Sequence, residues 1–274
     1  DDVSVFKVDE TITANGDVYY RDKINEIEIK TDKITYLQKI DKIFTKGKTY
    51  AEIQSKYKFN SNDVLFLKRD MKLSSSKKTT ILDKKNSLYE LDSFNYEINN
   101  EFLKGKNVKI IENSKVPIEE TNTYFFESGF FDLKNKVFNT GETKISLKKN
   151  IFDRSDNDPR LYGISSNHRD GITTVKKASF TSCSKNNKCP PWHLEASEIK
   201  HDKNKKQLIY DNAILKVYDL PILYFPKFFH PDPSVKRQSG FLKPQINNSN
   251  ELGDSLHVPY FHVISENKDL TFKP

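Results

Sequence analysis

The chain has 274 residues and a formal net charge of +7, yet only six of its 45 basic residues are Arg, the residue on which nucleic-acid readers rely for phosphate and base contacts. Apolar residues make up about a third of the chain, against roughly 45–50% in ordinary globular domains. This composition argues against a nucleic-acid partner and against a thick core, and it favours a thin, elongated molecule that buries one narrow face.

The apolar side chains that are present are mostly those of strands. Phe and Tyr number 19 and 13, and aromatic residues reach 12%, which favours an all-β fold. No apolar run approaches the 18 or so residues of a membrane helix, and the first residues lack the pattern of a signal peptide. Because the sequence begins DDVSVFKVDE without Met, we expect a mature or excised piece of a longer protein.

A two-stranded unit recurs along the chain with a step of about 30 residues. Each copy has an alternating strand, a polar turn containing Lys with Asn or Asp, a second strand and then a Gly or Asn. Copies lie at 28–53, 89–110, 124–147 and 192–217, with a degenerate copy at 64–76. The glycine markers are Gly16, Gly47, Gly105 and Gly141. Such hairpins cannot bury their own faces, so we expect them to stack into an extended antiparallel structure.

Period-2 alternation assigns one face of each unit to the interior. The residues that we expect to line this interior are Phe66, Phe94, Tyr96, Phe102, Trp192 and Leu194. Two readings stay open: these side chains fill a sandwich core, or they line an apolar groove. The low apolar content favours the groove. The polar stretch 153–171 interrupts the repeat and is expected to be a long loop.

The sequence contains no phosphate loop, nucleophile elbow or zincin motif. His168, Arg169 and Asp170 are adjacent and point in alternate directions, which favours a surface loop. The cluster around Cys183 and Cys189 leaves three alternatives: a disulfide that involves one or both thiols, free thiols, or a zinc site with His193 and His201. Five residues separate the thiols, whereas zinc ligands are usually C-x2-4-C. We expect no catalytic residue, metal or cofactor.

The segment LPILYFPKFFHPDPSVKRQSGFLKP at 220–244 combines dense aromatic residues with prolines. Proline removes a backbone donor, so this run cannot be a helix and makes a poor central strand. The prolines of the run are Pro221, Pro226, Pro231, Pro233 and Pro244.

From Ala178 onward, several long motifs resemble one family, the lipopolysaccharide-assembly proteins LptD (also OstA or Imp) of the Gram-negative outer membrane. The motifs are FTSC at 180–183, PPWHLEASEIKHD at 190–202, NAILKVYDLPILYFPKFFHPDP at 212–233, KRQSGFLKP at 236–244 and HVPYFHVISENKDLTFKP at 257–274. The resemblance is strong over about a third of the chain. The repeat before it fits the OstA-type domain more weakly.

The resemblance implies lipopolysaccharide transport and outer-membrane assembly, with no reaction catalysed. The implied fold is an OstA-like β-taco or β-jellyroll, followed by the start of an outer-membrane β-barrel. The implied partners are lipopolysaccharide, an LptA-like bridge protein at the N-terminal edge, an LptE-like lipoprotein through the barrel, and the outer membrane, with this segment mainly in the periplasm. Cys183 matches a groove cysteine of the family, which leaves its partner open between Cys189 and a barrel cysteine beyond Pro274.

The expected domains are a jellyroll at 1–218, a proline-rich hinge at 219–237 and two barrel strands at 238–274. The hinge prolines are Pro221, Pro226, Pro231 and Pro233. Pro244 and Pro259 each interrupt one barrel strand, which either weakens pairing as a lateral gate needs or is tolerated on an ordinary edge. The alternative function is a β-rich protein-docking scaffold of the cell envelope without a lipid path, and a zinc hydrolase is a distant third.

Overall fold

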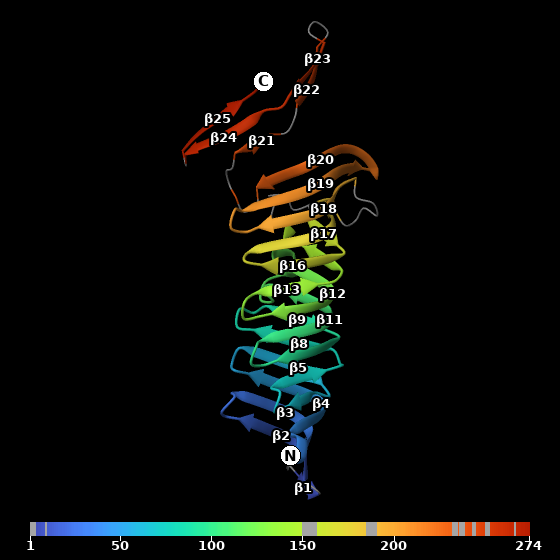
Figure 1. The fold of residues 1–274 in the computed structure, drawn as a ribbon, viewed down its shortest axis with the longest axis vertical. Helices are drawn as coiled ribbons and strands as arrows, with labels where there is room; N and C mark the ends of the chain where they lie inside the picture. Colours follow the sequence, from blue (N-terminus) through green and yellow to red (C-terminus); the bar gives the residue numbers. More distant parts are fainter. Residues whose placement is uncertain are drawn as a thin grey trace.

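The computed structural model shows an elongated molecule in which strands stack along the long axis (Figure 1). It describes residues 4–8, 10–149, 158–184, 191–231, 235, 239–242, 245–249, 253–265 and 267–274. Among these residues, the helical segments are two short 3-10 turns, η1 (Gln38–Ile40) and η2 (Ile118–Glu120), and no helix is long and apolar enough to cross a membrane. The predicted all-β class is confirmed.

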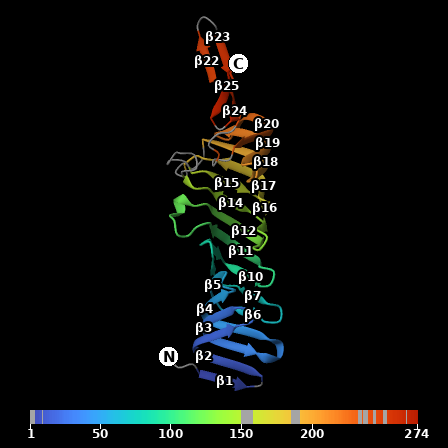
Figure 2. The same cartoon turned by 90° about the vertical axis from the view of Figure 1, so that its left-hand side faces the viewer.

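Antiparallel strands, most of them long, lie at both ends of the main sheet and in its middle. The N-terminal end contains β1 (Ser4–Val8), β2 (Thr11–Asp22), β3 (Ile27–Leu37) and β4 (Lys42–Ile53), and the middle contains β11 (Phe102–Ile111) and β12 (Thr123–Asp132). The C-terminal end contains β17 (Ile172–Thr181), β18 (Trp192–Asp202), β19 (Gln207–Val217) and β20 (Leu220–Pro231). In the side view of Figure 2, these strands follow one another from the N-terminal end to the C-terminal end.

Short strands form two facing walls between the long ones. Wall A contains β5 (Tyr57–Asn62), β8 (Thr79–Asp83), β9 (Leu88–Leu91), β14 (Thr143–Ser146) and β15 (Arg160–Gly163); wall B contains β6 (Leu65–Leu67), β7 (Lys72–Ser75), β10 (Ser93–Glu97), β13 (Val137–Thr140) and β16 (Ser165–Arg169). Strand β4 pairs with β5 through its C-terminal half and with β6 through its N-terminal half. Strands β11, β12 and β17 serve both walls in the same way. One sheet is thus folded over on itself.

The fold in the sheet is a corner, and the predicted glycine markers help to form it. Gly47 has a φ of +86°, and a Cβ there would lie 2.5 Å from a carboxylate oxygen of Asp32. Its N–H donates to the carboxylate of Asp63 at 3.0 Å, which joins the bend of β4 to the connection between β5 and β6. Gly16 has a φ of +100° at the register shift between β2 and β3. These positions need glycine because other residues rarely adopt such φ values.

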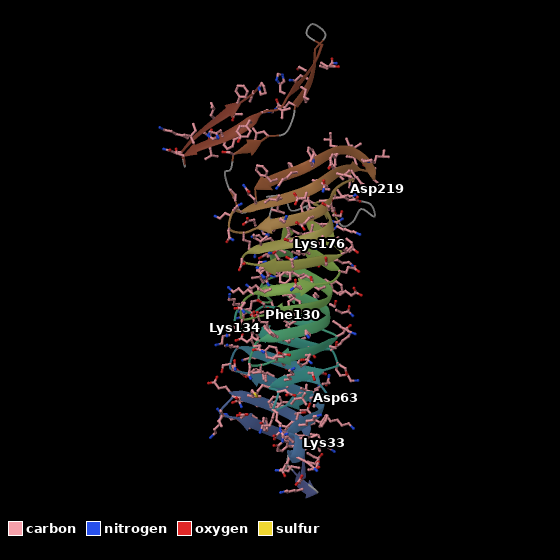
Figure 3. The ribbon with its side chains drawn as sticks, in the orientation of Figure 1. Lys33, Asp63, Phe130, Lys134, Lys176 and Asp219 are labelled. Atoms are coloured by element: carbon pink, nitrogen blue, oxygen red, sulfur yellow. The ribbon has the colours of Figure 1, made fainter. Side chains whose placement is uncertain are left out.

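Opposite the corner, the turns of wall A and wall B face each other along what we call the seam. Lys134, in a turn of wall B, marks this margin in Figure 3, and Asp63 marks the corner side. Strands such as β4 join the two walls covalently at the corner, whereas at the seam the walls meet through the side chains of their turns.

The predicted inward positions of the first units are buried. Phe66 is fully buried, and Phe94, Tyr96 and Val64 are at most 4% exposed. They belong to a large cluster that extends from Ala14 to Phe131. A second cluster extends from Ile145 to Ala213. The alternation therefore identified the inner face correctly at these positions of the first units.

Two stretches differ from the sequence expectations. Within the polar stretch 153–171, the described part from Asp158 onward forms β15 and β16, because their backbones complete the ladders to β13, β14 and β17. The sequence did not reveal β16 because its inward residues Ser166 and His168 are also polar, so no apolar alternation marks this strand. Leu220–Pro231, which the sequence places within the predicted hinge 219–237, forms the strand β20, and the role of this segment as a hinge stays a prediction.

Strand β20 tolerates its prolines because it is an edge strand. Its ladder is to β19 alone among the described strands of this sheet. Pro226 lies opposite Asn212, which has a φ of +51°, and no pair is formed at this position, whereas the register shift of this ladder lies beside Pro221, between Leu215 and Lys216. A proline on an edge or at a bulge removes no ladder hydrogen bond that a central strand would need. The sheet therefore continues to Pro231 before the chain leaves it.

Two small sheets lie beyond β20. One contains β21 (Gly240–Phe241), β24 (Tyr260–Ser265) and β25 (Lys268–Phe272), and the other pairs β22 (Gln245–Ser249) with β23 (Gly253–His257). The two strands predicted around the polar turn do pair with each other, and β25 adds a third. Many apolar side chains here are exposed, for example Leu256, Ile264 and Phe272.

Candidate functional site

A cavity of about 500 Å³ lies between the two walls in the C-terminal half of the folded sheet. Its walls come from β9, β11, β12, β13, β14, β15, β16, β17, β18 and β19 and the turns between them. Side chains that line it include Phe126, Phe131, Phe138, Ile145, Leu161 and Phe180. The size is within the range of ligand pockets, roughly 300–1,000 Å³. The lining is mainly apolar, so the cavity suits an apolar ligand or part of one.

Aromatic rings form one continuous surface of this cavity. Phe126 contacts Phe131 and Phe138, with ring centroids 5.8 and 5.6 Å apart, and Tyr124 stacks on Phe126 at 6.3 Å. His168 stacks on Phe138 at 5.3 Å. Such contacts favour defined ring orientations. The rings of β12, β13 and β16 therefore support one another along the cavity wall.

His168 is the titratable group on this aromatic surface. Its Nδ1 lies 2.8 Å from the hydroxyl oxygen of Thr173. Burial lowers the pKa of the imidazole, and the nearby Lys203 and His201 lower it further. The ring is therefore neutral at pH 7 and adds no charge to the cavity.

At the mouth of the cavity, the acidic side chains have hydrogen-bond partners within the fold, whereas the lysines are exposed. The carboxylate of Glu112 accepts hydrogen bonds from the hydroxyl of Tyr124 and from the side-chain amide of Asn122. Asp132 accepts from the backbone and side chain of Asn135, and these bonds lower its pKa. Both acids thus have partners within the fold. Three lysines of the mouth, Lys136, Lys148 and Lys203, are exposed at its rim.

The seam is closed in the N-terminal half. Glu101, in a turn of wall B and 9% exposed, pairs with Lys56 of wall A at 2.5 Å between Nζ and Oε1. It also accepts a hydrogen bond of 3.1 Å from the hydroxyl of Tyr57. Burial, followed by the charge of Glu101, raises the pKa of Tyr57 above its usual value. These bonds join the two walls across the seam.

Behind that closure the interior is filled by rings. Phe59 contacts Phe94 at 5.4 Å and Tyr96 at 5.3 Å between ring centroids, and Tyr57 contacts Tyr96 at 5.8 Å. All four side chains are buried. Of the two readings left open by the sequence, the filled core holds for this half, whereas the C-terminal half contains the cavity.

The six residues predicted to line a groove lie next to the cavity or away from it. Phe66, Phe94 and Tyr96 are in the packed core, and Trp192 and Leu194 pack against the second cluster. Trp192 lies 6.2 Å from the cavity-lining Phe180. None of the six is on the wall of this cavity.

Phe102 points to the outer face, which corrects its predicted inward orientation. It is half-buried against Phe130, with ring centroids 5.2 Å apart, whereas its neighbour Leu103 is fully buried. Adjacent residues of a strand face opposite sides, and in this strand Leu103 is the inward one. The sequence run YFFESGFF at 124–131 was the missed signal, since Tyr124, Phe126 and Phe131 line the cavity.

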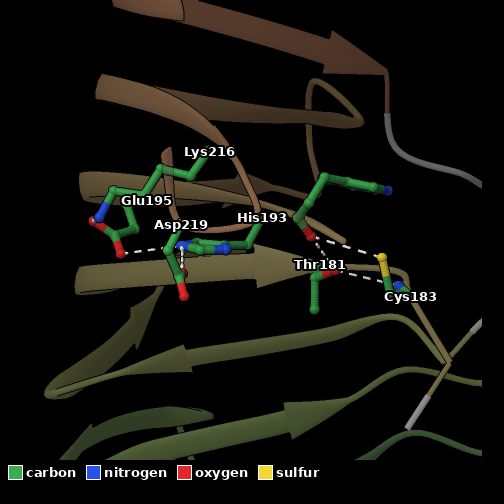
Figure 4. A network of polar contacts seen from close by, with 7 residues as sticks. Thr181, Cys183, His193, Glu195, Lys216 and Asp219 are labelled. Atoms are coloured by element: carbon green, nitrogen blue, oxygen red, sulfur yellow. Dashed lines mark hydrogen bonds and ion pairs between the residues drawn. The ribbon is translucent and has the colours of Figure 1, made fainter. Parts of the chain in front are cut away.

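Cys183 lies beside the start of β18. Its thiol forms no disulfide among the described residues and lies 3.7 Å from the carbonyl oxygen of Trp192, and its backbone N–H donates to the hydroxyl of Thr181 at 3.2 Å (Figure 4). Cys189 lies outside the described residues, so the disulfide stays a prediction.

Figure 4 also shows His193 between Glu195 and Asp219, with Nε2 distances of 3.2 and 3.7 Å. Lys216 pairs with Glu195 at 2.7 Å and lowers the pKa of that carboxylate. This network joins β18, β19 and the turn before β20. His201 lines the cavity instead, so the two histidines of the zinc alternative lie apart, and the described residues contain no group of three or more metal-ligating side chains.

The predicted hinge and gate prolines fall in three places. Pro221, Pro226 and Pro231 belong to β20. Pro259 is buried between β23 and β24, and its carbonyl accepts a 2.8 Å hydrogen bond from the N–H of Leu242. Pro233 and Pro244 lie outside the described residues.

Comparison with known proteins finds one recurring similarity. The chain is 38% identical over 104 residues to the LPS-assembly protein LptD of Polaromonas sp. (strain JS666 / ATCC BAA-500), 36% over 100 residues to that of Legionella pneumophila (strain Paris), and 36% over 100 residues to that of Pseudoalteromonas translucida (strain TAC 125).

These matches cover 36–37% of this chain and 12–13% of the relatives. No family model matches the chain. The predicted resemblance is nevertheless confirmed over about a third of the sequence, and the chain carries an LptD-like, OstA-type segment.

Proposed function

We propose that this chain carries lipopolysaccharide toward the outer membrane, with the acyl chains of the lipid in the cavity between the walls. The observation that carries the proposal is the apolar cavity of about 500 Å³, with its aromatic surface, in a chain similar to LPS-assembly proteins. Burying a methylene contributes about 0.8 kcal/mol, so ten of them would contribute about 8 kcal/mol. Tight binding alone does not move the lipid in one direction. Directional transport must therefore come from further lipid molecules that arrive behind the bound one and push it forward.

The geometry of the fold supports a route for the sugars. The cavity is lined from both walls and lies at the side where they are not joined. Acyl chains in the interior would leave the polar sugars in water along the seam. The seam in the N-terminal half, held by Glu101, Lys56 and Tyr57, must open if lipid enters from that end.

We further propose the assembly partners implied by the resemblance. An LptA-like bridge protein would add to the edge of β1, which pairs with β2 alone among the described strands, by strand addition. The segment after Pro231 would lead into a barrel in the outer membrane that holds an LptE-like lipoprotein. The exposed Leu220, Ile222 and Tyr224 of β20 suit that apolar boundary.

Photo-crosslinking tests the lipid path. A photoreactive phenylalanine analogue replaces Phe138 or Phe126 on the cavity surface, and exposed Lys85 in a control variant. We expect crosslinks to lipopolysaccharide from positions 126 and 138 and none from position 85. Silence at both, in variants shown to be folded, would favour the alternative of a protein-docking scaffold without a lipid path.

A further inference from the structure

The mouth of the cavity carries three lysines from separate elements. Lys136 lies in the turn between β12 and β13, Lys203 in the turn between β18 and β19, and Lys148 just after β14. The first two belong to the margin of wall B, and the third belongs to wall A. All three contribute to the cavity lining while their side chains remain exposed. Positive charge therefore flanks the apolar interior on both sides of the seam.

These lysines lack acidic partners within the part of the chain that the structure describes. No ion pair involves Lys136, Lys148 or Lys203, whereas the adjacent Lys149 pairs with Glu119 and Lys200 pairs with Glu198 and Asp211. Acids are therefore available nearby, and other lysines use them.

The acids of the mouth are also used by other groups. Glu112 is hydrogen-bonded by Tyr124 and Asn122, and Asp132 by Asn135. The cationic side chains are thus left to bind something from outside the chain.

An apolar cavity with a cationic rim is complementary to an amphiphile with an anionic head. Lysine binds phosphate as a compact point charge. Resting on the proposed function, we propose that Lys136, Lys148 and Lys203 form a phosphate-binding rim, which holds the phosphate groups of the lipid head at the seam while its acyl chains occupy the cavity. The rim sets the orientation of the lipid and distinguishes phosphorylated lipids from neutral ones.

The test compares two lipids and three proteins. The lipids are lipopolysaccharide and the same lipopolysaccharide after enzymatic removal of its phosphates. The proteins are the unmodified chain, the triple variant K136Q/K148Q/K203Q, and the control triple variant K46Q/K58Q/K176Q, whose three lysines are exposed on the outer faces. Both triple variants lose the same net charge, so a general charge effect appears in both. Circular dichroism verifies that each variant is folded.

We expect the rim variant to bind phosphorylated lipopolysaccharide about five- to fiftyfold more weakly, from three exposed charge interactions, and the dephosphorylated lipid as the unmodified chain does. The control variant should change either by less than about twofold. Equal binding of phosphorylated lipid by all three proteins would contradict the proposal that these lysines bind phosphate, and it would leave the proposed function intact. If the unmodified chain binds neither lipid, the proposed function fails, and the rim fails with it.

Discussion

The two halves of the folded sheet are built from the same hairpin unit, yet one is solid and the other is hollow. In the N-terminal half, the inner face carries Phe59, Phe66, Phe94 and Tyr96, and the seam is bonded through Glu101. In the C-terminal half, the cavity of about 500 Å³ remains between the walls although large side chains such as Phe131 and Phe180 line it, and the seam is flanked by lysines without acidic partners among the described residues. The packing of the facing walls and the chemistry of the seam, rather than the strand pattern, therefore distinguish the open interior from the filled one.

The largest expected change in stability comes from removing one aromatic ring from each half. Phe59→Ala in the packed half leaves a cavity among buried rings, and we expect a loss of about 3–5 kcal/mol in the free energy of unfolding. Phe138→Ala, on the surface of an existing cavity, should cost less than half of that because the ring is only partly buried. Urea denaturation of both variants measures the difference. Equal losses would mean that the two interiors are packed alike.

A smaller effect is expected from the seam. Glu101→Ala removes the partner of Lys56 and leaves the hydroxyl of Tyr57 without its acceptor, which should cost about 1–3 kcal/mol. Glu97→Ala, which breaks the more exposed pair with Lys72, is the matched control and should cost about 0–1 kcal/mol. Hydrogen exchange should show faster opening of β5 and β11 in the Glu101 variant. If the two variants behave alike, the seam bond does not hold the N-terminal half closed.

The smallest effect is a pH dependence confined to the hollow half. Burial lowers the pKa of His168 in the folded protein, so the unfolded chain binds a proton near pH 6.5 while the folded chain does not. Stability should therefore fall as the pH drops through 6.5, until the lower folded pKa is reached. All six histidines lie at or after position 168, so exchange in β2–β5 should change little. His168→Gln should reduce the acid sensitivity, and an unchanged profile would contradict this account.

The sequence predicted which side chains point inward better than it predicted whether the interior is a filled core or a cavity. Alternation placed Phe66, Phe94 and Tyr96 inward because a strand imposes a period of two. It carries no information on whether the opposite wall supplies large or small side chains, so it did not separate a core from a cavity. Phe102 was assigned inward because its position at the start of β11 was not resolved from the turn before it.

The proline-rich run shows a second limit of local reasoning. Prolines are unfavourable in a central strand, yet an edge strand such as β20 accepts them because it has a ladder partner on one side alone among the described strands. Whether a strand lies at an edge depends on the whole sheet. The cavity could not be predicted from local sequence either, because its lining residues Tyr124, Ile145 and Phe180 come together only after the sheet folds at its corner.

The most direct measurement is of lipopolysaccharide binding by a variant in which a larger side chain fills the cavity. Leu161→Trp adds volume on the cavity wall, and Tyr162→Trp, on the next residue of β15 and 42% exposed, is the control on the outer face. Lipopolysaccharide binding would be measured for both folded variants. The account predicts that Leu161→Trp binds at least tenfold more weakly while Tyr162→Trp binds as the unmodified chain does. Undiminished binding by Leu161→Trp would contradict the claim that the cavity holds the lipid.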